Sequence, residues 1–249
     1  MRSKVNKSIK KLLAALFWLA VWALLSIIIR NPLLLPSPAA VFKSLFEMIR
    51  TADYWLYTGV SLLRICAGIL SAMLLGIILA VLTCRFASLD TLFSPLITLI
   101  KSTPVASFVV LVLVWINRDY VPVLISALMV LPVIWANVSA GIKNTDYQLL
   151  EIAQVYRLSN SVKLKKIYFP SVLPYFRSAC LSALGFGWKS GIAAEVLTVP
   201  RRSIGRMIYE SKLYWQTTEL FAWTMSVIIL SLCLEKLVLR LMVGGKERA

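Results

Sequence analysis

Long apolar runs dominate this chain and limit what it can fold into. Six windows of about twenty mainly apolar residues, each long enough to cross a bilayer as a helix, cover 12–29, 58–83, 92–116, 121–142, 172–196 and 220–243. The chain is 59% hydrophobic and 15% charged, whereas soluble domains average about 45–50% apolar and about 25% charged residues. Because the excess lies in blocks, the sequence predicts an all-α, polytopic membrane protein with six transmembrane helices.

The charge balance narrows the possible functions. The net charge is +16, from 27 basic and 11 acidic residues, and Lys and Arg of this kind hold loops on the cytoplasmic side of a membrane and attract anionic lipid. Nucleic acid is not an expected partner, because no basic stripe carries interleaved aromatic residues on a soluble fold. The chain has no His, which excludes most histidine-based catalysis and common zinc sites. Its four cysteines stand at no metal or redox spacing, so we expect them to fill space.

The basic N-terminus sets the expected orientation. Five basic residues precede the first apolar run, which predicts that the N-terminus is cytoplasmic. No small-x-small cleavage site follows the run at 12–29, which favours a retained first helix over a signal peptide. Six crossings would return the C-terminus to the same side, with the basic loop at 143–171 also cytoplasmic.

The windows divide the chain into parts of one membrane domain. The segment after the first window opens with NPLLLPSP, whose prolines fix extended backbone, and residues 39–49 predict a short amphipathic helix on the membrane surface. The expected parts are a cytoplasmic N-terminus at 1–11, a first transmembrane helix at 12–29, an external segment at 30–57, a transmembrane core at 58–243 with a cytoplasmic loop at 143–171, and a cytoplasmic tail at 244–249.

One loop carries the wrong charge for its expected side. Residues 197–219 should be external, yet they hold four basic residues against two acidic ones. Either the charge bias fails locally, as it often does once the first helices are set, or these cations face an acidic docking partner. The basic residues are Arg201, Arg202, Arg206 and Lys212.

Ionisable side chains inside the apolar runs are the candidate path residues. A charge at the bilayer centre costs about 2.5–3.5 kcal/mol on insertion scales, so such groups should face protein or water. Lys189 shares a polar helical face with Ser182 and Gly185, which is typical of a water-filled path. Lys101 precedes Pro104, where a kink is expected. The hypothesis is a translocation path that favours an anionic solute; internal salt bridging or snorkelling is the alternative. The proposed path residues are Arg64, Lys101, Ser182 and Lys189.

Glu195 falls in a different pattern. It continues a row of small residues, Ala183, Gly187 and Gly191, which lets two helices approach closely. We therefore expect Gly187, Gly191 and Glu195 to serve helix packing, with the carboxylate buried and paired with a cation such as Arg64.

A polar, basic island interrupts the apolar runs at 151–174, EIAQVYRLSNSVKLKKIYFPSVLP. Asp146 or Thr145 can cap a helix over 147–156, residues 158–160 should break it, and a second short helix over 161–168 should end near Pro170. The apolar spacing Leu149, Leu150, Ala153 and Tyr156 predicts a ridge that another protein could grip.

This island resembles the EAA coupling loop of permease subunits of bacterial ABC importers. Glu151, Ala153, Ile167 and Pro170 are in register with that motif. Arg157 stands where the family has Gly, so either Arg157 or Asn160 is expected to take the positive φ of the turn. The stretches LLLPSP, SLLRICAGIL and GIAAEVL, in this order along the chain, are similar to the nitrate/sulfonate/taurine-type branch of these permeases.

The resemblance implies a type I ABC importer permease fold in the bacterial plasma (inner) membrane. It implies two ATPase subunits, a second permease subunit (a homodimer in this branch) and an external solute-binding protein as partners, besides the bilayer. The chain has no phosphate-binding Gly-x-x-x-x-Gly-Lys-Ser/Thr loop, so it is not expected to be an enzyme or to bind a cofactor, and ATP and Mg would bind the partner subunits. The residues that the resemblance assigns to ATPase coupling are Glu151, Ala153, Tyr156, Arg157, Leu158, Ile167 and Pro170.

Three classes of function compete at this point. A permease importing a small anionic solute, such as a sulfonate, taurine, nitrate or a vitamin precursor, is the first. An intramembrane enzyme would need a Ser–His or paired-Asp site, and the runs contain neither. A self-sufficient secondary transporter or channel is the alternative, but such proteins often carry inverted repeats, and the two halves show no symmetry.

Overall fold

The computed structural model describes residues 2–243, which fold into helices without a strand. The predicted tail at 244–249 lies outside the described residues. The helices are α1 (Arg2–Ile29), α2 (Pro38–Ile49), α3 (Ala52–Arg85), α4 (Ala87–Ser102), α5 (Val105–Val112), α6 (Val121–Lys143), α7 (Tyr147–Val155), α8 (Asn160–Lys163), the π-helical turn η1 (Leu164–Tyr168), α9 (Phe169–Thr198), α10 (Ile204–Leu213) and α11 (Thr217–Val243).

The expectation of six membrane-crossing helices is met only in part. Among the described residues, four helices are long and apolar enough to cross a bilayer, or five if one bent pair counts as a single span. The four spans lie in α1, α3, α6 and α11. The predicted fifth span lies within α9, which is 30 residues long but carries three ionisable residues, and it is not among the apolar helices.

The predicted third span is not one helix. It divides into α4 and α5, which meet at an angle of 106°. Thr103 and Pro104 have extended backbone between them, because a proline cannot donate its amide to the preceding turn and also restricts the residue before it. The expected kink at Pro104 is therefore a full break in the helix.

Three helices form the core of the bundle. α6 packs against both α3 and α9, and fully buried apolar side chains fill the space between them, as expected for close-packed helices. They include Ile65, Ala72, Val130, Ile134, Ala183 and Trp188. By contrast, the outer faces are apolar and exposed, with Leu63 at 74% and Leu70 at 64%, as lipid-facing surfaces are.

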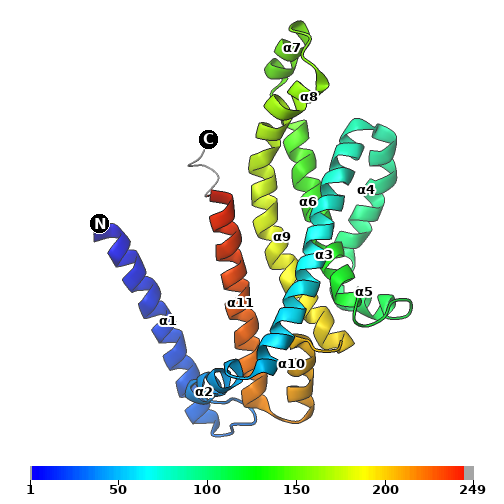
Figure 1. The fold of residues 1–249 in the computed structure, drawn as a ribbon. Coiled ribbons are helices and arrows are strands. Elements are labelled where there is room, and N and C mark those ends of the chain that lie inside the picture. The colour runs from blue at the N-terminus through cyan, green and yellow to red at the C-terminus, as the bar shows by residue number, and fades with distance from the viewer. Residues whose placement is uncertain (1, 244–249) are drawn as a thin grey trace.

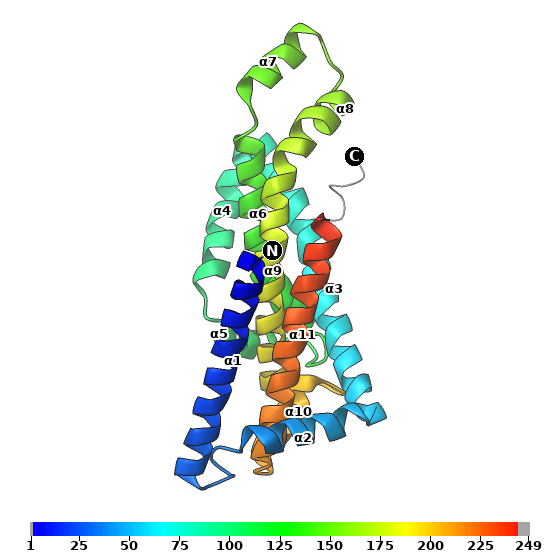
Figure 2. The same ribbon diagram turned by 90° about the vertical axis from the view of Figure 1, so that its left-hand side faces the viewer.

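The bundle has two distinct ends. α7 and α8 project beyond the other helices at one end, and both views show this (Figures 1 and 2). α1 begins and α11 ends on that side, whereas α2 and α10 lie at the opposite end (Figure 1). The short helix predicted over 39–49 is present as α2, with Ser37 as its N-cap and Val41 and Leu45 buried.

Candidate functional site

The island at 151–174 begins with a well-capped helix. The Asp146 side chain accepts a hydrogen bond from the amide of Gln148 at 2.9 Å, as an N-cap does. α7 ends in a Schellman motif, in which the amide of Leu158 donates to the Ala153 carbonyl at 2.9 Å and that of Arg157 to Gln154 at 3.0 Å. Arg157 has φ 48°, so Arg157 takes the left-handed turn.

The second half of the island differs from the prediction. Asn160 begins α8 and does not supply the positive φ. The second short helix does not end near Pro170, because α8 and η1 lead directly into α9. Pro170 lies in the first turn of α9, and the wider π-helical turn comes just before it. The hairpin is thereby joined to a core helix without a loop.

The exposed ridge of α7 coincides with the predicted one in part: Leu149 is 44% and Tyr156 74% exposed, whereas Ala153 is buried. Ala153 is fully buried and Ile167 is 7% exposed, so both pack inside the hairpin. The large apolar side chains that face solvent include Ile152 at 51%, Val155 at 78% and Tyr156 at 74%. The predicted spacing included Leu149 and Tyr156 but missed Ile152 and Val155, which are also exposed on α7. Glu151 is exposed beside them.

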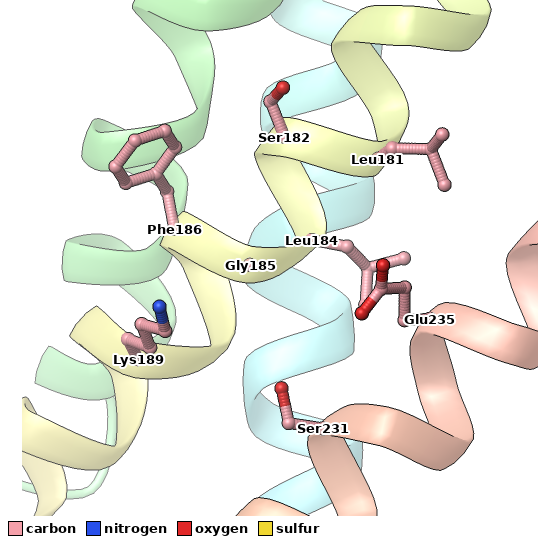
Figure 3. Close-up of a pocket in the computed structure, with 8 residues that line it drawn as sticks. All are labelled: Leu181, Ser182, Leu184, Gly185, Phe186, Lys189, Ser231 and Glu235. Atoms are coloured by element: carbon pink, nitrogen blue, oxygen red, sulfur yellow. The ribbon is translucent and has the colours of Figure 1, made fainter. Parts of the chain in front are cut away.

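A groove of about 230 Å³ runs between α9 and α11. Ser182, Gly185 and Lys189 line it from α9, and Ser231 and Glu235 line it from α11 (Figure 3). Two of the predicted path residues, Ser182 and Lys189, are therefore together. Glu235 was missed, although the test that singled out Lys189, an ionisable residue within an apolar run, also applies to it.

The other two predicted path residues do not line this groove. The ammonium group of Lys101 lies 5.7 Å from the centre of the Trp135 ring, a cation–π arrangement. The Arg64 guanidinium forms an ion pair with Asp119 at 3.4 Å. Arg64 thus belongs to a different part of the molecule, near the turn before α6.

Glu195 is fully buried, and its partners differ from the expected cation. Its carboxylate accepts hydrogen bonds from the Ser61 hydroxyl at 2.8 Å and from the Gly205 amide at 3.1 Å. Ser61 in turn accepts a bond from the amide of Ile204 at 2.9 Å. The predicted pairing with Arg64 is wrong, because Asp119 holds that residue. Glu195 instead ties α9 to α3 and to the start of α10.

The small residues on α9 lie where helices meet closely. A Cβ on Gly187 would lie 2.6 Å from Ile69 and 2.8 Å from Val130, and a Cβ on Gly191 would lie 2.7 Å from Ile65. Real side-chain carbons do not approach so near, so α9 contacts α3 and α6 at these positions because glycine has no side chain. The Ser126 hydroxyl also donates to the Gly187 carbonyl at 3.1 Å.

No group of three or more Cys, Asp or Glu side chains within residues 2–243 is arranged to hold a metal ion. The features that remain are mechanical and electrostatic: a projecting hairpin, a groove with one cation and one carboxylate, and a buried carboxylate that joins three helices.

Comparison with known proteins bears on these features. The family model described as binding-protein-dependent transport system inner membrane component matches residues 72–244. A protein of Haemophilus influenzae named as a probable ABC transporter permease is 25% identical over 228 residues, which are 91% of this chain and 92% of that protein. The taurine transport system permease protein of Escherichia coli is 23% identical, covering 86% of this chain and 80% of its own length.

A third relative is the bicarbonate transport system permease protein of Synechococcus elongatus, 26% identical over 227 residues, which are 84% of this chain and 79% of that protein. The branch predicted from the residue motifs is confirmed by these relatives. The family and the apolar helices make this a multi-pass inner-membrane protein. Since the family model covers well over half of its length, the chain belongs to the inner membrane components of binding-protein-dependent transport systems.

Proposed function

We propose that this chain is the transmembrane permease subunit of an ATP-driven ABC importer, and that its α7–α8 hairpin docks on the ATPase. The observation that carries the proposal is the ridge of Ile152, Val155 and Tyr156, exposed at the tip of a hairpin that projects beyond the bundle (Figure 2). An exposed apolar ridge beside a carboxylate suits a groove on another protein. Family membership supports the importer class over the self-sufficient carrier, which is the alternative.

The geometry supports a mechanical role for the hairpin. It is fixed by a capped start and a hydrogen-bonded turn, and it connects α6 to α9, two helices of the core. Because α8, η1 and α9 follow one another without a break, displacement of the tip would move α9 as a rigid body. That helix carries both Lys189 in the groove and Glu195 in the buried contact, so motion at one end would reach both.

Partners and orientation complete the proposal. Two ATPase subunits would bind ATP and Mg, a second copy of this chain would complete the path, and an external solute-binding protein would deliver the solute. The hairpin and both termini would face the cytoplasm of a bacterial cell, with α2 and α10 outside. The basic residues of the N-terminus and of 143–171 support this orientation.

We propose that the groove between α9 and α11 contributes to the solute path. Lys189 and Glu235 are both exposed in it, and neither forms an ion pair among residues 2–243. Two unpaired charges should not face lipid, so water, solute or a second copy would cover them. The solute would be a small anion or a molecule that bears an acid group, a class that includes the taurine and bicarbonate named for two relatives.

The docking role of the hairpin is tested by Glu151→Lys and Val155→Asp. The first reverses the exposed charge and the second places a charge on the ridge, so we expect each to reduce co-purification of the ATPase subunit by about tenfold, as loss of a central contact does. Uptake into proteoliposomes should fall in parallel.

Glu47→Lys is the matched control, because it makes the same charge reversal at a 65% exposed side chain in α2, at the far end of the molecule. It should leave association and uptake unchanged. Normal association of both hairpin variants would remove the hairpin as the docking site. Solute uptake by the purified chain without an ATPase would overturn the importer assignment.

A further inference from the structure

The short loop between α9 and α10 is held in an unfavourable backbone conformation. Val199 has φ 47° and Arg202 has φ 50°. The left-handed region is unusual for any residue other than glycine, and for a β-branched residue such as valine it is a true outlier. Such conformations persist only where the surrounding structure imposes them, and they cluster at functional sites.

Three hydrogen bonds that backbone amides donate to side chains hold the loop in this conformation. The amide of Arg201 donates to Asp119 at 2.8 Å, that of Ile204 to Ser61 at 2.9 Å, and that of Gly205 to Glu195 at 3.1 Å. Ser61 and Glu195 are completely buried. A Cβ on Gly205 would collide with Glu195, which shows how closely the loop lies against α9. The backbone from 201 to 205 is therefore fixed.

The same contacts leave the loop's guanidinium groups unpaired. Asp119 binds the backbone of Arg201 and the side chain of Arg64, not the Arg201 guanidinium. Arg201, Arg202 and the neighbouring Arg118 are exposed, and none of the ion pairs within residues 2–243 uses them. Arg206, by contrast, is neutralised by Glu210 at 2.7 Å. Arg118, Arg201 and Arg202 form what we call the arginine patch.

Resting on the function proposed above, we infer that the arginine patch is the docking point for an acidic surface of the external solute-binding protein. The patch lies near the end where α10 is found, opposite the hairpin (Figure 1), and excess basic residues there run against the usual distribution of charge. Anionic lipid would also attract these cations, but lipid requires only charge near the surface. A fixed, strained backbone suits a partner with matching geometry.

The inference is tested on the whole complex of this chain and its ATPase, in nanodiscs of phosphatidylcholine alone. The probe is the solute-binding protein that supports ATP-driven uptake by the wild-type complex. We expect Arg201→Glu combined with Arg202→Glu to slow its association about tenfold at low salt, with a smaller difference at high salt, as for steered encounters. Reversal of the facing acidic residues on the binding protein should restore association.

Lys43→Glu is the control, because it reverses an exposed cation, 79% accessible, in α2; it should bind as wild type. The thermal unfolding midpoint checks the fold, and Arg201→Gln with Arg202→Gln provides a milder variant with a smaller expected effect. Wild-type association of both arginine variants would overturn the inference. A defect seen only when phosphatidylglycerol is added would assign the patch to lipid instead. If no solute-binding protein supports uptake, the importer function itself fails.

Discussion

At position 157 the backbone has the left-handed conformation that glycine favours, although the residue is arginine. The family motif places Gly at this turn, and Arg157 nevertheless has φ 48° with both hydrogen bonds of the Schellman motif. The left-handed conformation costs a non-glycine residue roughly 1–2 kcal/mol. The two hydrogen bonds of the Schellman motif hold Arg157 in this conformation, so the hairpin keeps its shape at some cost in local stability.

Replacing Arg157 by Gly should therefore stabilise the hairpin. We expect slower hydrogen exchange at the amides of Arg157's neighbours in the turn, by a factor that corresponds to about 1 kcal/mol, because glycine takes a positive φ without strain. Arg157→Ala is the control, since it removes the charge and keeps the strain. Equal exchange in the Gly and Ala variants would mean that the positive φ carries no cost here.

Glu195 shows a limit of single-residue prediction. Its position in a row of small residues correctly indicated burial, and its carboxylate is fully buried. Its partners are a serine 134 positions away and a backbone amide of the next helix. Backbone donors leave no trace in side-chain spacing, so the sequence favoured a cation that the structure gives to Asp119 instead.

At the scale of the element, the glycines of α9 lie on two different faces, one packed against other helices and one open. Gly187 and Gly191 lie against α3 and α6, whereas Gly185, on the same helix, has no atom within 4 Å of an added Cβ. The sequence grouped these residues by helical face: Gly185 with the polar stripe, and Gly187 and Gly191 with the packing row. The structure places them on those two faces, because helical periodicity is fixed by backbone geometry.

Alanine substitution should distinguish the two faces. Gly187→Ala inserts a methyl group 2.6 Å from Ile69, and overpacking of this kind costs about 1–3 kcal/mol. We expect a clear fall in the thermal unfolding midpoint of the purified protein. Gly185→Ala should leave the midpoint unchanged or slightly higher, since alanine favours helix by up to about 1 kcal/mol. Equal effects would mean that α9 does not make the close contact.

At the scale of the whole molecule, the groove depends on two helices that are distant in the chain. α9 contributes Lys189 and Ser182, and α11 contributes Glu235 (Figure 3). Of these two charges, Lys189 suits an acid group of the solute, and Glu235 suits an amine where the solute carries one. Sequence spacing alone does not predict that Lys189 and Glu235 line the same groove.

We expect Lys189→Met to reduce uptake of an acidic solute by about tenfold, because a hydrogen bond to a charged group contributes about 1.5–3 kcal/mol. The measurement is ATP-driven uptake of taurine and of bicarbonate by the reconstituted complex. Lys236→Met is the control, since it removes the same charge from the neighbouring α11 position, which does not line the groove. Unchanged rate and solute preference in Lys189→Met would remove Lys189 from the path.

The sequence by itself determined the properties that depend on local order. Apolar windows located the long helices, Asp146 and Pro104 marked a helix start and a helix break, and the motif at 151–170 indicated the family. These succeed because hydrophobic length, capping and proline stereochemistry act within a few residues of the chain.

Only the tertiary structure decided which residues meet. It buried Ala153 and exposed Val155, gave Arg64 to Asp119 and Glu195 to Ser61, joined the second half of the hairpin to α9, and placed Lys189 and Glu235 along the same groove. Each of these depends on how helices far apart in the chain rotate and pack against one another. That packing is fixed by the fit of many side chains at once, and no single stretch of sequence contains it.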